Sequence, residues 1–467
     1  MVKFLFLQDM AFEYLSPMQL SANLKKAGHD FELLIIPEEP KWINKMKDYN
    51  PDYILFSASA GHHNYILSLA REVRKYVNVP IILGGMYPTF DPDAAIKHEE
   101  VDMICMGEGD VALVEFADNS KRTNIKGMGF KKDGKVIMND YARYVEDLDS
   151  LPFMDRSIYD KYKILQEIPA KKFMTGRGCP YPCTYCFNHH LKRIIGDKGK
   201  YARRRSAEHV IDEILDVKSK YNMKLVRFPD DTFTYNKPWL LDFLNKYKER
   251  VKLPFTCLGR PDELTEEVVI ALEGAGCRNI FFGIESGNDY MRNEVMKRNT
   301  SKEKIINAGR LLKKYKIKFG TFNILGTPGE TLEMAYETIK LNRQIGTDYP
   351  LASIFQPLSG TDMEDYAFRK GYLKRKLKPE EYMMFNAGSL MEGMDVRQLE
   401  NLERFFYLAC KFPFLDPLIK KMITLPPNRF FKLVFDLSSG KSLVGMMGLD
   451  LITSLKLGWK LRNKSFV

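Results

Sequence analysis

Three closely spaced cysteines are the residues of this chain best suited to chemistry. Cys179, Cys183 and Cys186 stand as Cys-x3-Cys-x2-Cys in a run rich in glycine and proline. Three thiolates satisfy only three irons of a four-iron cluster. The fourth iron then keeps an open coordination position for a substrate or cosubstrate, as open metal sites in enzymes do. The spacing therefore predicts an iron-sulfur cluster that takes part in catalysis.

A structural zinc site is the main alternative for this triad. Such sites normally close with a fourth Cys or His, and His189 or His190 follows closely enough to serve. A disulfide framework is disfavoured, because seven cysteines in 467 residues are sparse and odd in number and we expect no secretory signal. The sequence therefore predicts a reduced, cytoplasmic protein. The four other cysteines lie in apolar contexts typical of buried thiols: Cys105, Cys257, Cys277 and Cys410.

Behind the triad, short β-prone runs alternate with helical patterns. This alternation predicts repeated βα units and a parallel sheet, with functional groups at the carboxyl ends of the strands. We expect strands near 171–175, 225–229, 255–259, 279–284, 318–325 and 351–356. We expect helices near 206–221, 237–250, 265–275, 301–316 and 331–346.

The chain before the triad predicts a second α/β unit. Strands expected at 3–7, 31–36, 53–58, 80–83 and 102–105 alternate with helices, which favours a doubly wound, Rossmann-like sheet. A ligand crevice should then lie beyond the carboxyl ends of its strands. Asp133-Gly134, between two β-prone runs, predicts a tight hairpin near 131–135.

The triad, with Tyr185 directly before its third cysteine, resembles the signature of the radical S-adenosylmethionine (SAM) superfamily. The resemblance implies a [4Fe-4S] cluster whose unique iron is chelated by SAM, and a 5′-deoxyadenosyl radical that abstracts hydrogen from an unactivated carbon. It also implies that the six strands form an open (βα)6 partial barrel. Residues at the strand ends that match the positions of SAM contacts are Tyr185, Asp231, Arg260, Gly283, Glu285, Ser286 and Asn323.

The N-terminal unit resembles the cobalamin-binding domain of one radical SAM subgroup, which includes the anaerobic magnesium-protoporphyrin cyclase. Two departures stand out. The Asp-x-His-x-x-Gly motif is absent from the run after the first strand, so cobalamin is expected without a histidine ligand from the protein. Tyr87 stands where relatives often carry His, which leaves open a domain that keeps only the fold. His62 and His63 are interpreted as a polar pair at a helix start. The resemblance implies cobalamin contacts at Ser57, Ser59, Gly84, Gly85, Tyr87, Pro88, Gly107 and Glu108.

These patterns predict an order of domains along the chain. A basic, apolar and helical C-terminal domain carries most of the net charge of +11, since 18 Lys and Arg against 9 Asp and Glu follow Ala367. It is expected to cap the open barrel, or to contact an anionic membrane surface peripherally. Its longest apolar stretch, 442–461, contains three charges that disfavour spanning. The predicted units are a cobalamin-binding-like domain at 1–140, a connector at 141–168, the radical SAM partial barrel at 169–366 and the C-terminal domain at 367–467.

A run of three arginines, Arg203-Arg204-Arg205, precedes Ser206. Ser206 is a good N-cap for the helix that follows, and the arginines are interpreted as reaching anionic groups of a cofactor. Nucleic-acid binding is not expected, because the run is short and lacks interleaved aromatics.

Together the resemblances imply a cobalamin-dependent radical SAM enzyme. The leading prediction is a methyltransferase acting on an unactivated carbon of a hydrophobic metabolite such as a lipid, isoprenoid or tetrapyrrole, with a low-potential electron donor of the flavodoxin or ferredoxin type. Oxidative cyclisation or ring rearrangement with the same cofactors is the first alternative. A non-catalytic iron-sulfur or zinc protein, and a radical SAM enzyme with a vestigial first domain, are the others.

Overall fold

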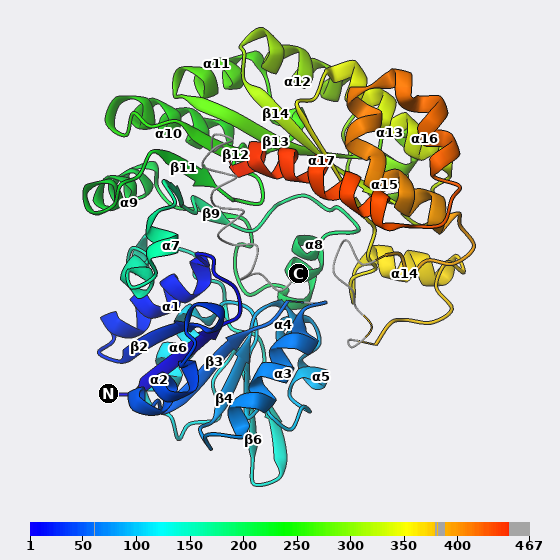
Figure 1. The fold of residues 1–467 in the computed structure, drawn as a ribbon. Coiled ribbons are helices and arrows are strands. Elements are labelled where there is room, and N and C mark those ends of the chain that lie inside the picture. The colour runs from blue at the N-terminus through cyan, green and yellow to red at the C-terminus, as the bar shows by residue number, and fades with distance from the viewer. Residues whose placement is uncertain (60, 379–380, 382–387, 448–467) are drawn as a thin grey trace.

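The computed structural model describes residues 1–59, 61–378, 381 and 388–447, which form two large sheets, one above the other in Figure 1. The N-terminal sheet has the order β2-β1-β3-β4-β5-β6-β7. Its first five strands are parallel, and β6 and β7 add an antiparallel hairpin. The strands are β1 (Lys3–Gln8), β2 (Asp30–Ile35), β3 (Tyr53–Ser57), β4 (Ile81–Gly84), β5 (Met103–Cys105), β6 (Met128–Lys132) and β7 (Lys135–Met138).

Helices cover both faces of this sheet because side chains along each strand alternate between the faces. Phe4 and Phe6 of β1 pack in a core with residues of α1 and α6, whereas Leu5 and Leu7 pack with residues of α2 and α3. The predicted doubly wound fold is confirmed. Its strand order reverses between β1 and β3, which opens a crevice at the carboxyl edge. The helices are α1 (Leu15–Lys26), α2 (Trp42–Tyr49), α3 (His63–Arg74), α4 (Met86–Phe90), α5 (Pro92–Ala95) and α6 (Gly109–Asp118).

The second sheet has six parallel strands in the order β15-β14-β13-β12-β11-β8, so each strand pairs with its neighbours in chain order. This is the predicted (βα)6 partial barrel. The strands are β8 (Ala170–Lys172), β11 (Leu225–Phe228), β12 (Phe255–Gly259), β13 (Cys277–Glu285), β14 (Lys318–Leu325) and β15 (Tyr349–Ile354). The helices between them are α9 (Ala207–Lys220), α10 (Lys237–Arg250), α11 (Glu266–Gly274), α12 (Lys302–Lys314) and α13 (Leu332–Ile345).

The hairpin predicted near 131–135 is present at the edge of the first sheet, and its turn residues Asp133 and Gly134 have φ values of 49° and 72°. Positive φ at both positions is what a type I′ hairpin turn requires.

Short elements join the two sheets. Between the sheets lie α7 (Lys163–Gln166), the small ribbon of β9 (Gly176–Arg177) and β10 (Arg203–Arg204), and α8 (Phe187–Ile195).

The C-terminal helices close one end of the barrel. Figure 1 shows α17 crossing the concave side of the sheet, where the Asn279 amide donates to the Gly445 carbonyl at 2.6 Å and the Ser442 hydroxyl donates to the Pro350 carbonyl at 3.2 Å. Both contacts lie near the amino ends of strands, so the carboxyl ends stay open to the first domain. The predicted helical cap is therefore present. These helices are α14 (Asp362–Arg369), α15 (Val396–Lys411), α16 (Asp416–Met422) and α17 (Arg429–Met447).

Among the residues that the structure describes, no helix is long and apolar enough to cross a membrane. Most of the apolar stretch at 442–461 lies outside the described residues.

Gly445 and Gly440, both in α17, allow a matched test of this cap. A Cβ at Gly445 would lie 2.5 Å from the ring of Tyr349, which is itself stacked on Phe281, whereas a Cβ at Gly440 would meet nothing within 4 Å. We expect Gly445→Ala to lower the midpoint of thermal unfolding, since overpacking costs about 1–3 kcal/mol. Gly440→Ala should raise it or leave it unchanged, because alanine favours helix by about 1 kcal/mol over glycine. The midpoints are measured by circular dichroism, and equal midpoints for the two variants would argue against the packed cap.

Candidate functional site

The cysteine triad lies in the loop between β9 and α8, and α8 begins directly after Cys186. Each sulfur has a polar neighbour. The Thr232 hydroxyl lies 3.6 Å from the Cys179 sulfur, Arg298 Nη1 donates to Cys183 at 3.8 Å, and Asn188 Nδ2 donates to Cys186 at 3.8 Å. Donors around ligating sulfurs stabilise the negative charge of thiolates. Burial raises the pKa of the free Cys186 thiol to about 12, so a bound cation is needed to hold it as thiolate.

The donor set fits a cluster better than a zinc ion. In a cubane each thiolate binds a different iron. No group of three or more His, Cys, Asp or Glu among the described residues is arranged to hold a single metal ion. The two candidate fourth ligands are engaged elsewhere. His189 Nε2 lies 3.2 Å from a carboxylate oxygen of Asp362, and the His190 ring packs against Phe90.

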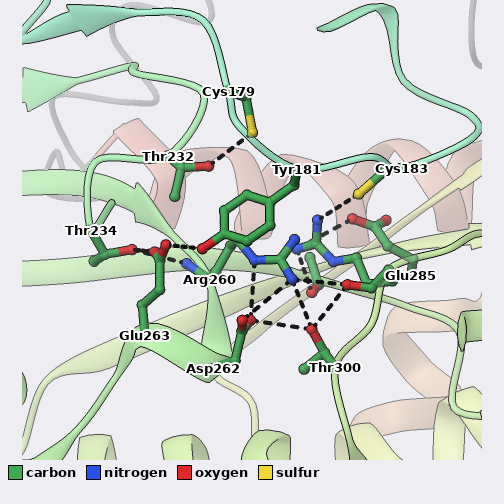
Figure 2. Close-up of polar contacts among 12 residues, drawn as sticks. Cys179, Tyr181, Cys183, Thr232, Thr234, Arg260, Asp262, Glu263, Glu285 and Thr300 are labelled. Atoms are coloured by element: carbon green, nitrogen blue, oxygen red, sulfur yellow. Dashed lines mark hydrogen bonds and ion pairs between the residues drawn. The ribbon is translucent and has the colours of Figure 1, made fainter. Parts of the chain in front are cut away.

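Tyr181, inside the cysteine loop, ties that loop to the barrel. Its ring covers the guanidinium of Arg260, with 3.5 Å from the guanidinium carbon to the ring centroid, and Figure 2 shows its hydroxyl pointing at Glu263. The second oxygen of Glu263 accepts from Thr234. Burial raises the pKa of the Glu263 carboxyl, and these two hydroxyl donors oppose the rise. The loop is thus anchored to the ends of β11 and β12.

Arg260 is 2 % exposed and is held by protein contacts on three sides. Its Nε lies 3.1 Å from Asp262, and its Nη2 donates to the Arg298 carbonyl at 2.9 Å and to the Thr300 hydroxyl at 3.0 Å. Nη1 is buried and has no hydrogen-bond partner among the described residues. One nitrogen of Arg260 is therefore left for an anionic ligand, and the SAM contact expected of this residue stays a prediction.

Arg298 connects Glu285 to Cys183, because its guanidinium contacts both side chains. The Arg298 guanidinium donates to the Gly283 carbonyl at 3.0 Å and lies 3.9 Å from a Glu285 oxygen. Burial raises the pKa of Glu285, while Arg298 and a hydrogen bond from Tyr185 oppose the rise. A Cβ at Gly283 would come within 1.8 Å of the Glu285 carboxylate, so only glycine leaves room for this side chain. Three of the predicted SAM contacts, Tyr185, Gly283 and Glu285, are therefore brought together.

The structure places Ser286 and Asn323 in buried networks of their own. The Ser286 hydroxyl accepts from the backbone N–H of Asn288 at 3.2 Å. Asn323 accepts from the Asn342 amide at 2.9 Å and donates to the Leu351 carbonyl at 2.8 Å. Of the seven predicted SAM contacts only Asp231 borders the cavity described next, and the role of all seven stays a prediction.

One cavity of about 570 Å³ lies between the two sheets. It is bordered on the first domain by loops at the carboxyl ends of β3, β4 and β5, and on the barrel by the cysteine loop, α8 and the end of β11. Asn188 and Asp231 reach it from the barrel, and Asn188 also contacts Cys186. No cysteine of the triad borders the cavity itself, and Asn188 connects the cavity to Cys186. Predicted cobalamin residues that border it are Ser57, Ser59, Gly84, Gly85, Gly107 and Glu108.

Tyr87 and Pro88 are buried and do not border this cavity. The Tyr87 ring stacks on His63 with 4.1 Å between centroids, and its hydroxyl lies 2.9 Å from His98 Nε2. His63 is the first residue of α3 and His62 its N-cap, as the interpretation of a helix-start pair predicted. No histidine borders the cavity among the described residues.

Close packing and unsatisfied polar atoms suit the cavity to a large ligand with polar edges. Gly85 has a φ of 96°, and a Cβ there would meet the Ala58 carbonyl at 2.7 Å, so backbone forms this wall. The Tyr144 hydroxyl and Asp230 Oδ2 are buried without a partner among the described residues, and both residues border the cavity. Buried polar atoms normally find partners, so the cavity fits a ligand that supplies them, as the amide groups around a corrin ring would.

Ion pairs join the two domains at the cavity edge. Arg203 forms two contacts with the Glu108 carboxylate, at 2.5 and 3.0 Å. Arg177 lies 2.6 Å from Asp110 and 3.4 Å from Glu108. Both acids stand at the start of α6, where the helix dipole favours negative charge. The carboxyl edges of the two sheets are thus held face to face.

The three-arginine run is used inside the protein. Arg203 binds Glu108, Arg204 lies 3.2 Å from Asp230, and Arg205 lies 2.5 Å from Glu213. Ser206 caps α9 as predicted, accepting from the His209 N–H. Sequence alone offered no means of pairing these arginines with protein carboxylates. Arg203 also borders the cavity, and the expected cofactor contact stays a prediction.

Family models and relatives agree with this geometry. A model of the B12 binding domain matches residues 15–117, and one of the radical SAM superfamily matches 173–341. An uncharacterized methyltransferase of Pyrococcus horikoshii is 30 % identical over 78 % of this chain and 79 % of its own length. The anaerobic magnesium-protoporphyrin IX monomethyl ester cyclase of Rubrivivax gelatinosus is 26 % identical over 73 % of this chain and 62 % of its own.

A solved structure shares the whole fold. The cobalamin-dependent SAM radical enzyme OxsB, with aqua-cobalamin and SAM bound, matches with a TM-score of 0.69 at 17 % identity, over 99 % of this chain and 75 % of its own. The chain therefore belongs to the cobalamin-dependent radical SAM family, and it is a radical SAM enzyme.

Sequence reasoning missed Arg298 and the role of Tyr181. Arg298 lies in the loop after a π-helical turn, η5 (Tyr290–Val295), and no spacing rule connects it to Cys183. Tyr181 was visible inside the motif, but its stacking on Arg260 depends on the barrel closing around it.

Replacing Arg298 should change the reduction potential of a bound cluster. A positive charge and an N–H···S contact near a cluster both stabilise its reduced form. Arg298→Met removes the charge and the contact with Cys183. We therefore expect a lower midpoint potential in a redox titration followed by electron paramagnetic resonance. Arg298→Lys keeps the charge and should shift the potential less. An unchanged midpoint in the methionine variant would contradict the contact.

Arg203→Met tests the junction between the domains. Breaking a buried ion pair costs about 3–5 kcal/mol. The junction should therefore open more often in this variant, and we expect a protease to cleave faster within 141–168. Arg193→Met is the matched control, because the Arg193 side chain is 47 % exposed in its pair with Asp362 and such pairs contribute about 1 kcal/mol or less. Equal cleavage rates in the two variants would show that the junction does not rest on Arg203.

Proposed function

We propose that this enzyme is a methyltransferase that uses cobalamin and SAM to methylate an unactivated carbon of a hydrophobic metabolite. The observation that carries the proposal is the single cavity, which reaches from the glycine loops after β4 and β5 to Asn188 and Asp231 beside the triad. The Pyrococcus relative described as a methyltransferase supports the reaction class.

The residues divide the work as follows in this proposal. When bound, the cluster supplies the electron for SAM cleavage and cobalamin carries the methyl group, while a flavodoxin or ferredoxin type of protein reduces them. The three cysteines hold the cluster. Tyr185 and Glu285 orient the SAM amino group, and Arg260 Nη1 meets the SAM carboxylate. The backbone at Gly84, Gly85 and Gly107 accommodates the corrin ring, with no histidine supplied to cobalt.

Asp231 is placed to receive a hydroxyl or amine group. It lies exposed within the cavity, yet the surrounding protein raises the pKa of its carboxyl, with a hydrogen bond from Asn188 opposing the rise. At a pH above this raised pKa the Asp231 carboxylate accepts hydrogen bonds, and at a lower pH the carboxyl group holds a proton. In the proposal it orients the substrate or the SAM ribose next to the cluster.

The cavity walls favour a hydrophobic substrate. The side chains that α8, the connector and the turn between β8 and β9 place around it are largely apolar. Such walls bind apolar molecules by removing their surface from water. They include Tyr144, Met154, Met174, Phe187, Leu191 and Ile195.

Cofactor and product analysis tests the proposal. Protein purified anaerobically with cobalamin should contain about four iron and four sulfide per chain and a corrin spectrum. Turnover with a lipid extract should give 5′-deoxyadenosine, S-adenosylhomocysteine and a product one methylene heavier. Cys183→Ala should lose the iron, whereas Cys410→Ala, in a buried site of the C-terminal core, should keep it.

Two other results would redirect the conclusion. The cyclase of Rubrivivax favours a second candidate, oxidative cyclisation at the same site. That reaction would yield 5′-deoxyadenosine without S-adenosylhomocysteine or added mass. Zinc in place of iron and sulfide would instead support a non-catalytic protein.

A further inference from the structure

Exposed apolar side chains concentrate in one short C-terminal segment. Among the described residues, six of the large apolar side chains that are at least 45 % exposed fall between residues 414 and 437, and the other five are scattered over the rest of the chain. Isolated exposed apolar residues are normal, whereas a contiguous group marks an interaction site. The six, together called the C-terminal patch, are Phe414, Leu418, Leu425, Phe430, Leu433 and Leu437.

The patch is not the core-facing side of these helices. Ile419, Ile423 and Phe431 are buried in the core that α15 forms with β14 and β15, and they alternate along the chain with the exposed residues. The short helix η7 (Pro413–Leu415), α16 and α17 all pack around α15. The inward face is therefore already satisfied, and the outward face is apolar as well.

Positive charges are interleaved with the patch. Lys420, Lys421, Arg429 and Lys432 are exposed within the same segment. The segment holds two acids, and one of them, Asp416, is bound by Arg343 through contacts of 2.5 and 2.8 Å. Apolar side chains flanked by lysine and arginine are typical of surfaces that lie in the headgroup region of anionic membranes.

We propose that the C-terminal patch docks peripherally on an anionic phospholipid membrane. The apolar side chains enter the headgroup boundary, and the four cations contact the lipid phosphates. A second copy of this chain is a poorer occupant, because a two-fold interface would place the cationic patch against itself. The inference is independent of the reaction proposed above.

Vesicle flotation of the full-length holoprotein tests this surface. We expect the protein to float with vesicles of phosphatidylcholine containing phosphatidylglycerol, to float less as salt increases, and to remain unbound with phosphatidylcholine alone. The triple variant Phe414→Ser, Leu418→Ser, Leu437→Ser should reduce the bound fraction about tenfold. Lys421→Glu with Lys432→Glu should abolish the preference for anionic vesicles.

A matched control keeps the test interpretable. Val136→Ser with Ile270→Ser removes apolar side chains that are 50 % and 49 % exposed outside the patch, and it should bind vesicles like the unaltered protein. Circular dichroism and SAM cleavage in vesicle-free buffer confirm that each variant is folded, and they separate this proposal from the proposed reaction.

Three results would overturn the inference. These are an unaltered protein that is found with no vesicle, a triple variant that binds as well as the control, and a dimer in light scattering that the same triple variant dissociates. The last result would assign the patch to a second copy of the chain.

Discussion

The rest of the site depends on ion pairs between the first domain and the β9–β10 ribbon. They join Glu108 and Asp110 to Arg177 and Arg203. Each sheet could present its carboxyl edge in any direction if it were alone. These contacts turn the two edges toward each other across one cavity. A buried ion pair gains little net stability once its desolvation is counted. Its value here is geometric, because guanidinium and carboxylate meet in a fixed orientation.

A second constraint fixes the cysteine loop within that frame. The loop is held by Tyr181 on Arg260, and the Arg260 guanidinium in turn binds the carbonyl of Arg298, whose side chain donates to Cys183. Gly283 must lack a side chain for Glu285 to fit beside them. The chain therefore relies on one connected set of contacts to place the thiols, the acidic group and the two arginines.

Local patterns were enough to predict the strands, the helices and the cysteine triad, because alternation and turn residues are read within a few positions. The resemblance to the cobalamin-binding domain pointed to the loops at Gly84-Gly85 and Gly107, which follow strands directly. Side-chain direction was harder to infer. Tyr87 and Pro88 share the glycine loop but are packed inward, and Ser286 and Asn323 are satisfied by neighbours distant in sequence. The partners of the arginine run and of Arg298 depend on tertiary contacts that no spacing encodes. The same holds for the C-terminal helices, whose apolar residues the sequence revealed without showing which of them face outward.

The central claim is that a cluster on the triad and cobalamin in the cavity lie close together, and the magnetic interaction between them tests it most directly. Reduced cluster and cob(II)alamin are both paramagnetic, so pulsed electron paramagnetic resonance of the doubly loaded protein reports whether their spins are near each other. The account predicts dipolar coupling that is present only when both centres are paramagnetic and that weakens in Arg203→Met. Two independent, uncoupled signals from a fully loaded protein would contradict it.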